Sequence, residues 1–203
     1  MEVEQALADL EEVRDRLASC QRFRGYSVPA TLLSGALAIA AGLVQLAVTP
    51  LPATSNDMRA YVFIWVTCLA GALVTYYGSL TAWYVGNAGT QARRQTRSAG
   101  AAIAPAIGLG AVLSLALMAH GLISMLPGVW YACYGVGLLS SRAMVPRAIM
   151  PAAIGFVVFG SALLLLPHQS LALAWWIMPL GFGVGQLYIG SKLHQAELAE
   201  MVV

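Results

Sequence analysis

Long apolar runs, separated by short charged or turn-rich segments, are the feature that most constrains this chain. The runs cover residues 29–49, 60–86, 100–126, 128–141, 147–166 and 170–190. A helix needs about 20 mostly apolar residues to cross the hydrocarbon layer of a bilayer. With 59% hydrophobic and 10% charged residues, the 203-residue chain has more apolar surface than a soluble domain of this length can bury. The sequence therefore predicts an all-α integral membrane bundle with six transmembrane helices.

The distribution of basic residues predicts the orientation of the bundle. The fourth run is short for a full crossing, so a re-entrant segment is the alternative there. If all six runs cross, only Arg59 lies on one side of the membrane, and every other basic residue lies on the opposite side: Arg14, Arg16, Arg22, Arg24, Arg93, Arg94, Arg97, Arg142, Arg147 and Lys192. Basic residues accumulate on the cytoplasmic side. We therefore expect a multi-pass membrane protein with both termini in the cytoplasm.

Taken in pairs, the six runs predict three helical hairpins within a transmembrane domain at 26–191. Each second run begins near a tryptophan and contains tyrosine. The tryptophans are Trp65, Trp130 and the Trp175–Trp176 pair. One interpretation is a weak threefold repeat, and the other is an aromatic belt at the outer membrane interface.

Residues 1–25 predict a cytoplasmic amphipathic helix, and residues 192–203 a short cytoplasmic tail. Apolar side chains recur at heptad spacing in the first segment, and four of them form the predicted partner interface: Val3, Leu10, Val13 and Leu17. Acidic residues crowd the start of this segment and basic residues its end, which suits the helix dipole. Fewer than three heptads are marginal as a free coiled coil, so we expect this face to dock on its own bundle, on a second copy or on a partner.

The predicted spans contain few side chains able to do chemistry. Apart from Arg147 at the first position of the fifth run, no acidic or basic residue lies inside them, which argues against ion-coupled transport. No catalytic or metal-binding motif appears, so we expect no enzymatic activity and no cofactor. His120 is the only histidine within a run; a metal or haem ligand is one interpretation, and a hydrogen-bonded structural histidine the other. The net charge of +2 offers no broad basic face, so we expect no direct nucleic-acid binding.

Two similar glycine-spaced segments, LPGVWYACYGVG at 126–137 and PLGFGVGQLYIG at 179–190, suggest either close helix packing or a pocket. The candidate pocket residues are Tyr134, Gly135, Gly137, Gly183, Gly185, Gln186 and His120. Such a set suits a channel or carrier for a small neutral or hydrophobic molecule. Glutamines within apolar runs also suit interhelical hydrogen bonds, and Gln45 and Gln186 are the two candidates.

Several short motifs resemble a group of small six-span bacterial membrane proteins of unassigned activity. They are the acidic N-terminal helix ending at Arg22-Phe23, Leu126-Pro127-Gly128-Val129-Trp130 with Tyr134-Gly135, Pro146 with Met150, Leu166-Pro167, and Trp176 with Leu180-Gly181-Phe182-Gly183. The resemblance covers the N-terminal helix and the last three or four runs. Because some members are encoded near winged-helix regulators, it implies such regulators as partners, and it implies no catalytic residue.

These observations favour a non-enzymatic interaction, scaffold or regulatory subunit that acts through its N-terminal helix. The expected partners are membrane lipids together with a second copy, another membrane-complex subunit or a cytoplasmic regulator. The channel or carrier is the alternative.

Overall fold

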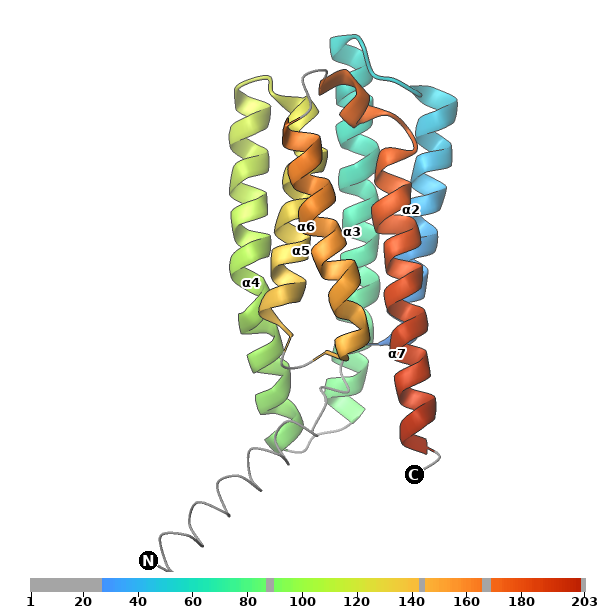
Figure 1. Cartoon of the computed structure of the whole chain (residues 1–203), viewed down its shortest axis with the longest axis vertical. Coiled ribbons are helices and arrows are strands. Elements are labelled where there is room, and N and C mark those ends of the chain that lie inside the picture. The colour runs from blue at the N-terminus through green and yellow to red at the C-terminus, as the bar shows by residue number, and fades with distance from the viewer. Residues whose placement is uncertain (1–26, 87–89, 143–144, 166–168, 202–203) are drawn as a thin grey trace, which may run out of the picture.

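The computed structural model describes residues 27–86, 90–142, 145–165 and 169–201, and every regular element among them is helical. The elements are α2 (Val28–Val48), α3 (Ser55–Gly86), α4 (Thr90–Ala119), η1 (Ile123–Met125), α5 (Leu126–Ser140), η2 (Arg147–Ile149), α6 (Met150–Leu165), η3 (Gln169–Leu173), η4 (Pro179–Gly185) and α7 (Gln186–Met201). The long helices run side by side along one axis, with α4 at one edge and α2 at the other (Figure 1). The predicted N-terminal helix lies outside the described residues.

Five of the predicted spans correspond to helices that are long and apolar enough to cross a membrane. These are Val28–Val48, Ser55–Ala82, Ala101–Ala119, Ile123–Ser140 and Arg147–Leu165. The predicted sixth span at 170–190 is instead divided among η3, the π-helix η4 and α7. The helix formed by η4 and α7 carries Lys192, Glu197 and Glu200 in its second half, which leaves only its first half apolar. The fold is thus an all-helical bundle with five apolar helices of membrane-spanning length.

Local sequence signals explain where two of the helices begin. The side chain of Asp57 accepts a hydrogen bond from the Thr54 backbone at 2.9 Å, while the Asp57 backbone donates to the Thr54 hydroxyl at 3.2 Å. This reciprocal capping starts α3 at residue 55, earlier than the predicted residue 60. The break predicted between the third and fourth runs, at Leu126-Pro127-Gly128, is wrong. Those residues begin α5, because proline is well tolerated in a first helical turn, and the chain reverses at Gly121, whose φ is +72°.

The helices pack in two groups of three. In one group α2 contacts α3, η4 and α7, and in the other α5 contacts both α4 and α6. The first two predicted hairpins therefore consist of closely packed neighbours. The third does not, because α6 packs on α5 whereas η4 and α7 pack on α2. The arrangement as three equivalent hairpins is not confirmed.

Glycines bring the backbones of α5 and α6 into direct contact. A Cβ atom added at Gly160 would lie 2.6 Å from the Ala132 nitrogen and 2.8 Å from the Gly128 oxygen. One added at Gly135 would lie 2.8 Å from the Ala153 oxygen. Small residues permit such close approach where lipid removes the hydrophobic drive between helices. The α5–α6 pair is therefore in backbone contact along its length.

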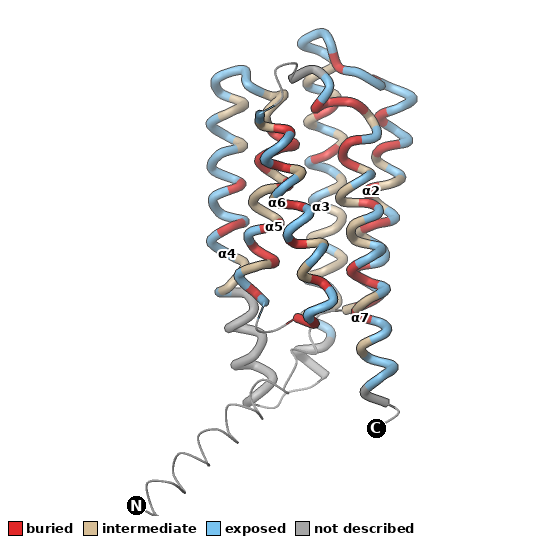
Figure 2. Tube along the Cα trace, in the orientation of Figure 1, coloured by how far each residue is buried: buried red, intermediate tan, exposed pale blue. Residues whose placement is uncertain are grey.

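The extent of burial differs between the helices, and α4 in particular is largely exposed (Figure 2). In the membrane-length stretch that contains α5, 44% of the residues are buried, compared with 11% in α3 and in α4. Large apolar side chains of α3 and α4 remain exposed, such as Phe63, Val74, Val112 and Leu115. Apolar surface of this extent suits contact with lipid chains.

The Gly160 contact yields a stability prediction. We expect Gly160→Ala to lower the free energy of unfolding by about 1–3 kcal/mol, because its methyl group would press on backbone atoms that cannot move independently. Gly108→Ala is the matched control, since a Cβ atom there meets nothing within 4 Å. Unfolding of the purified protein in mixed micelles with rising SDS content measures both variants. Equal stability of the two would contradict the α5–α6 packing.

Candidate functional site

Five aromatic rings join the two groups of helices. This ring cluster consists of Tyr131 and Tyr134 from α5, Phe156 and Phe159 from α6, and Phe182 from η4. The centroid of the Tyr131 ring lies 5.0 Å from that of Phe182, and the Tyr134 and Phe156 centroids are 4.9 Å apart. Edge-on and tilted aromatic pairs at such distances stabilise packing beyond their area burial. The cluster therefore fills the space between α5, α6 and η4.

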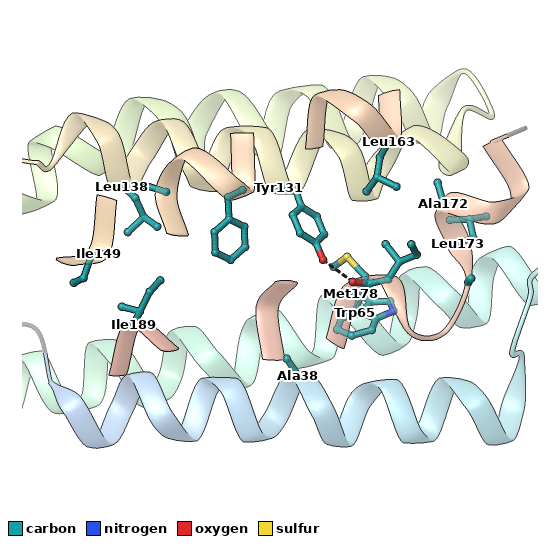
Figure 3. Packing of buried hydrophobic residues seen from close by; sticks show 14 of the residues in the cluster. Ala38, Trp65, Tyr131, Leu138, Ile149, Leu163, Ala172, Leu173, Met178 and Ile189 are labelled. Carbon is teal, nitrogen blue, oxygen red and sulfur yellow. Dashed lines mark hydrogen bonds between the residues drawn. The ribbon is translucent and has the colours of Figure 1, made fainter. Parts of the chain in front are cut away.

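Tyr131 also contacts the backbone at the start of the last helix, which consists of η4 and α7. It is 1% exposed and points from α5 toward the segment that contains Met178 (Figure 3). Its hydroxyl donates to the Ile177 carbonyl at 2.5 Å. A Cβ atom at Gly181 would overlap the Tyr131 ring and hydroxyl, so only glycine leaves room for them. The π-helix η4 begins at this place, which fits the rule that an inserted side chain perturbs a helical ladder.

A second polar link holds one end of the bundle together. Gln45 in α2 is fully buried; its amide nitrogen donates to the Leu173 carbonyl at 2.7 Å, and its oxygen accepts from the Trp65 indole at 2.8 Å. Gln45 thus joins α2 to α3 and to η3. The aromatic-belt interpretation is wrong for Trp65, which is 3% exposed because its indole has this buried partner. Among the side-chain polar groups of the described residues, only the Tyr61 hydroxyl is buried without a hydrogen bond.

The predicted pocket residues are distributed over several separate contacts between helices. Gln186 donates to the Tyr134 hydroxyl at 2.6 Å, which confirms an interhelical hydrogen bond for this glutamine. A Cβ atom at each of the four glycines would meet a different neighbour: Val157 and Ala153 for Gly135, Ala106 and Ile103 for Gly137, Ile39 for Gly183, and Phe156 for Gly185. His120 is exposed in the turn after α4. The structure therefore brings Tyr134 and Gln186 together and distributes the other residues over separate surfaces.

An open apolar groove lies between α6 and the last helix. Its volume is about 540 Å³, within the range of ligand pockets. Pro151, Ala152 and Gly155 line the α6 side. Leu180, Gly181, Val184, Gly185 and Tyr188 line the opposite side, above the rings of Tyr131, Phe156 and Phe159. The groove exists because α6 and the last helix pack on different neighbours, which leaves their facing surfaces apart.

Of the candidate pocket residues predicted from the sequence, only Gly185 lines the groove. Sequence reasoning missed the α6 wall, where Gly155 and Phe156 are adjacent in an apolar run that carries no polar signal. It also missed the role of Tyr131, since its partner is a backbone carbonyl 46 residues away. Spacing within one helix cannot show such a contact.

The described residues contain no group of three or more His, Cys, Asp or Glu side chains that could hold a metal ion. Cys68 and Cys133 are free thiols. The predicted partner interface at Val3, Leu10, Val13 and Leu17 lies outside the described residues. Comparison with known protein families, with curated proteins and with solved structures finds no match to this chain.

The Tyr131 hydrogen bond can be tested by removing one oxygen. We expect Tyr131→Phe to lower the free energy of unfolding by about 1–3 kcal/mol, because the buried Ile177 carbonyl loses its hydroxyl donor. Tyr77→Phe is the matched control, since Tyr77 is 55% exposed on α3. Unfolding in mixed micelles should show little change for this control. A Tyr131→Phe protein as stable as the wild type would contradict the proposed role of the hydroxyl.

Proposed function

We propose that this chain is a six-span protein of the bacterial inner membrane that serves as a non-enzymatic interaction, scaffold or regulatory subunit. Its cytoplasmic N-terminal helix provides the contact with a second copy, with another membrane-complex subunit or with a winged-helix type of regulator. The observation that carries this proposal is the way in which the ring cluster fills the space between the two groups of helices. A bundle packed in this way exerts its function at its surfaces.

The polar contacts between helices support the same conclusion. Gln45 and Gln186 make hydrogen bonds to buried or half-buried partners, and Tyr131 makes one to a backbone carbonyl. Groups that coordinate a transported ion or activate a substrate are more typically ionisable and face a water-filled path. Here the amide and hydroxyl groups hold helices together. The heptad face of residues 3–17 is then the feature of the sequence best suited to bind another protein.

A carrier for a small neutral or hydrophobic molecule is the second candidate. The groove favours it, because Gly185 and Tyr188 belong to the glycine- and tyrosine-rich segments that suggested a pocket. However, the groove is open along the side of the bundle, and three rings of the cluster, Tyr131, Phe156 and Phe159, line it. A carrier would have to part those rings to move a molecule between the two sides of the bundle, so we rank this function second.

The six-span topology predicts where cysteines react. We expect Asn56→Cys to be labelled by a membrane-impermeant maleimide in intact cells, and Gln195→Cys only after the membrane is opened. The background protein carries Ser in place of Cys20, Cys68 and Cys133. Both positions are exposed in the structure, so unequal labelling would reflect their side of the membrane. Labelling of both in intact cells would mean an even number of crossings between them and would overturn the topology.

The interaction proposal predicts that the heptad face controls association. We expect Leu10→Glu with Leu17→Glu to reduce the mass of the complex purified in mild detergent, because two charges would enter an apolar seam. Ala8→Glu with Ala18→Glu is the control, since it adds the same charges outside the seam. Light scattering and chemical cross-linking in membranes measure the outcome. A wild-type protein that is monomeric and lacks a stoichiometric partner would contradict the proposal.

A further inference from the structure

Two basic residues lie at one end of the apolar groove. Arg147, in η2 just before α6, is exposed, and Lys192 lies one helical turn after Tyr188, with its nitrogen 5.6 Å from the centre of the Tyr188 ring. The Tyr188 hydroxyl donates to the Ala148 carbonyl at 3.1 Å, which holds α7 beside η2. The two cations therefore stand on opposite sides of the same end of the groove.

These cations have few partners of their own. Lys192 donates to the Gln195 side chain at 3.0 Å, and neither cation forms an ion pair with an acid among the residues that the structure describes. Because guanidinium and ammonium groups are cationic donors, they favour an anion between them. The topology proposed above puts this end of the bundle at the cytoplasmic side of the membrane.

The rest of the groove is apolar and faces outward. It extends from Pro151 to Phe159 along α6, about 12 Å at the helical rise of 1.5 Å per residue. Leu180 and Val184 on its other wall are about half exposed, and a Cβ atom at Gly155 would meet nothing within 4 Å. This shape suits a flexible hydrocarbon chain that lies parallel to the helices.

We propose that the groove binds one anionic glycerophospholipid, with an acyl chain along Gly155 and Val184 and the phosphate between Arg147 and Lys192. Cations placed between helices at the cytoplasmic side are a known way to recognise anionic headgroups. A zwitterionic lipid offers the same chain, but its ammonium group opposes the two cations. This inference is independent of the proposed role of the N-terminal helix.

The charge part of the proposal is tested by lipid titration. The purified full-length protein is stripped of lipid, and binding of dioleoyl phosphatidylglycerol and dioleoyl phosphatidylcholine is measured by native mass spectrometry. We expect one phosphatidylglycerol to bind in preference to phosphatidylcholine. Arg147→Gln with Lys192→Gln should weaken its affinity roughly 10- to 30-fold, since each cation near a membrane surface contributes about 1 kcal/mol, or roughly fivefold. Arg59→Gln, at the opposite end, should leave it within about twofold, because it lies away from the headgroup.

The groove part is tested by filling it. We expect Gly155→Leu to remove the tightly bound phosphatidylglycerol, whereas Gly108→Leu on the open face of α4 retains it. The SDS unfolding midpoint of each variant shows whether it is folded, and the single variants Arg147→Gln and Lys192→Gln replace the pair if the pair unfolds. Equal binding of the two lipids, or unchanged binding by Gly155→Leu, would overturn the proposal. Full displacement of the bound phosphatidylglycerol by glycerol 3-phosphate would also overturn the proposal. A dimer that dissociates in Gly155→Leu while the amount of bound lipid stays the same would overturn it as well.

Discussion

The insertion of Tyr131 into the last helix is the contact on which the arrangement of this bundle depends. The two groups of three helices share few close backbone contacts, so side chains must connect them. Tyr131 does this with both of its parts: its ring packs against Phe156, Phe159 and Phe182, and its hydroxyl bonds to the Ile177 carbonyl. Gly181 makes the insertion possible by leaving the space that the phenol occupies.

The same contact explains why the groove has its shape. Bulky rings between α6 and η4 keep these helices apart, whereas Gly160 draws α6 onto α5. A Cβ atom added at Gly42 would overlap Pro179, so a glycine also draws α2 onto the start of η4. The last helix and α6 are thus held by neighbours on opposite sides. Their facing surfaces are left with rings as a floor and an open space above Gly155.

The sequence predicted five apolar helices of membrane-spanning length because their cause is local, whereas the contacts that define the site are not local. A run of about 20 apolar residues has one stable conformation in a bilayer, since only a helix pairs every backbone group within the segment. An amide in hydrocarbon likewise requires a partner, and Gln45 and Gln186 both have one. Trp65, in contrast, lies at a place in the sequence that is typical of an interfacial tryptophan. Only the tertiary structure shows that Gln45 lies opposite its indole. Glycines at 135, 137, 183 and 185 look alike in sequence, yet they face different neighbours, because helix rotation is set by packing.

In a bilayer, an apolar groove of this kind is always in contact with hydrocarbon, so occupancy alone says little about function. Any lipid chain restores the dispersion contacts that the exposed Gly155, Leu180 and Val184 would otherwise lack. Selectivity must therefore come from the charged end of the groove. There, Arg147 and Lys192 distinguish an anionic lipid, whose phosphate has no compensating cation, from a zwitterionic lipid, whose ammonium group compensates its phosphate. The groove determines where a chain lies, and the two cations determine which headgroup it belongs to. A variant with a filled groove and intact charges therefore tests the part of the proposed site that holds the acyl chain. A variant with an open groove and altered charges tests the part that holds the headgroup.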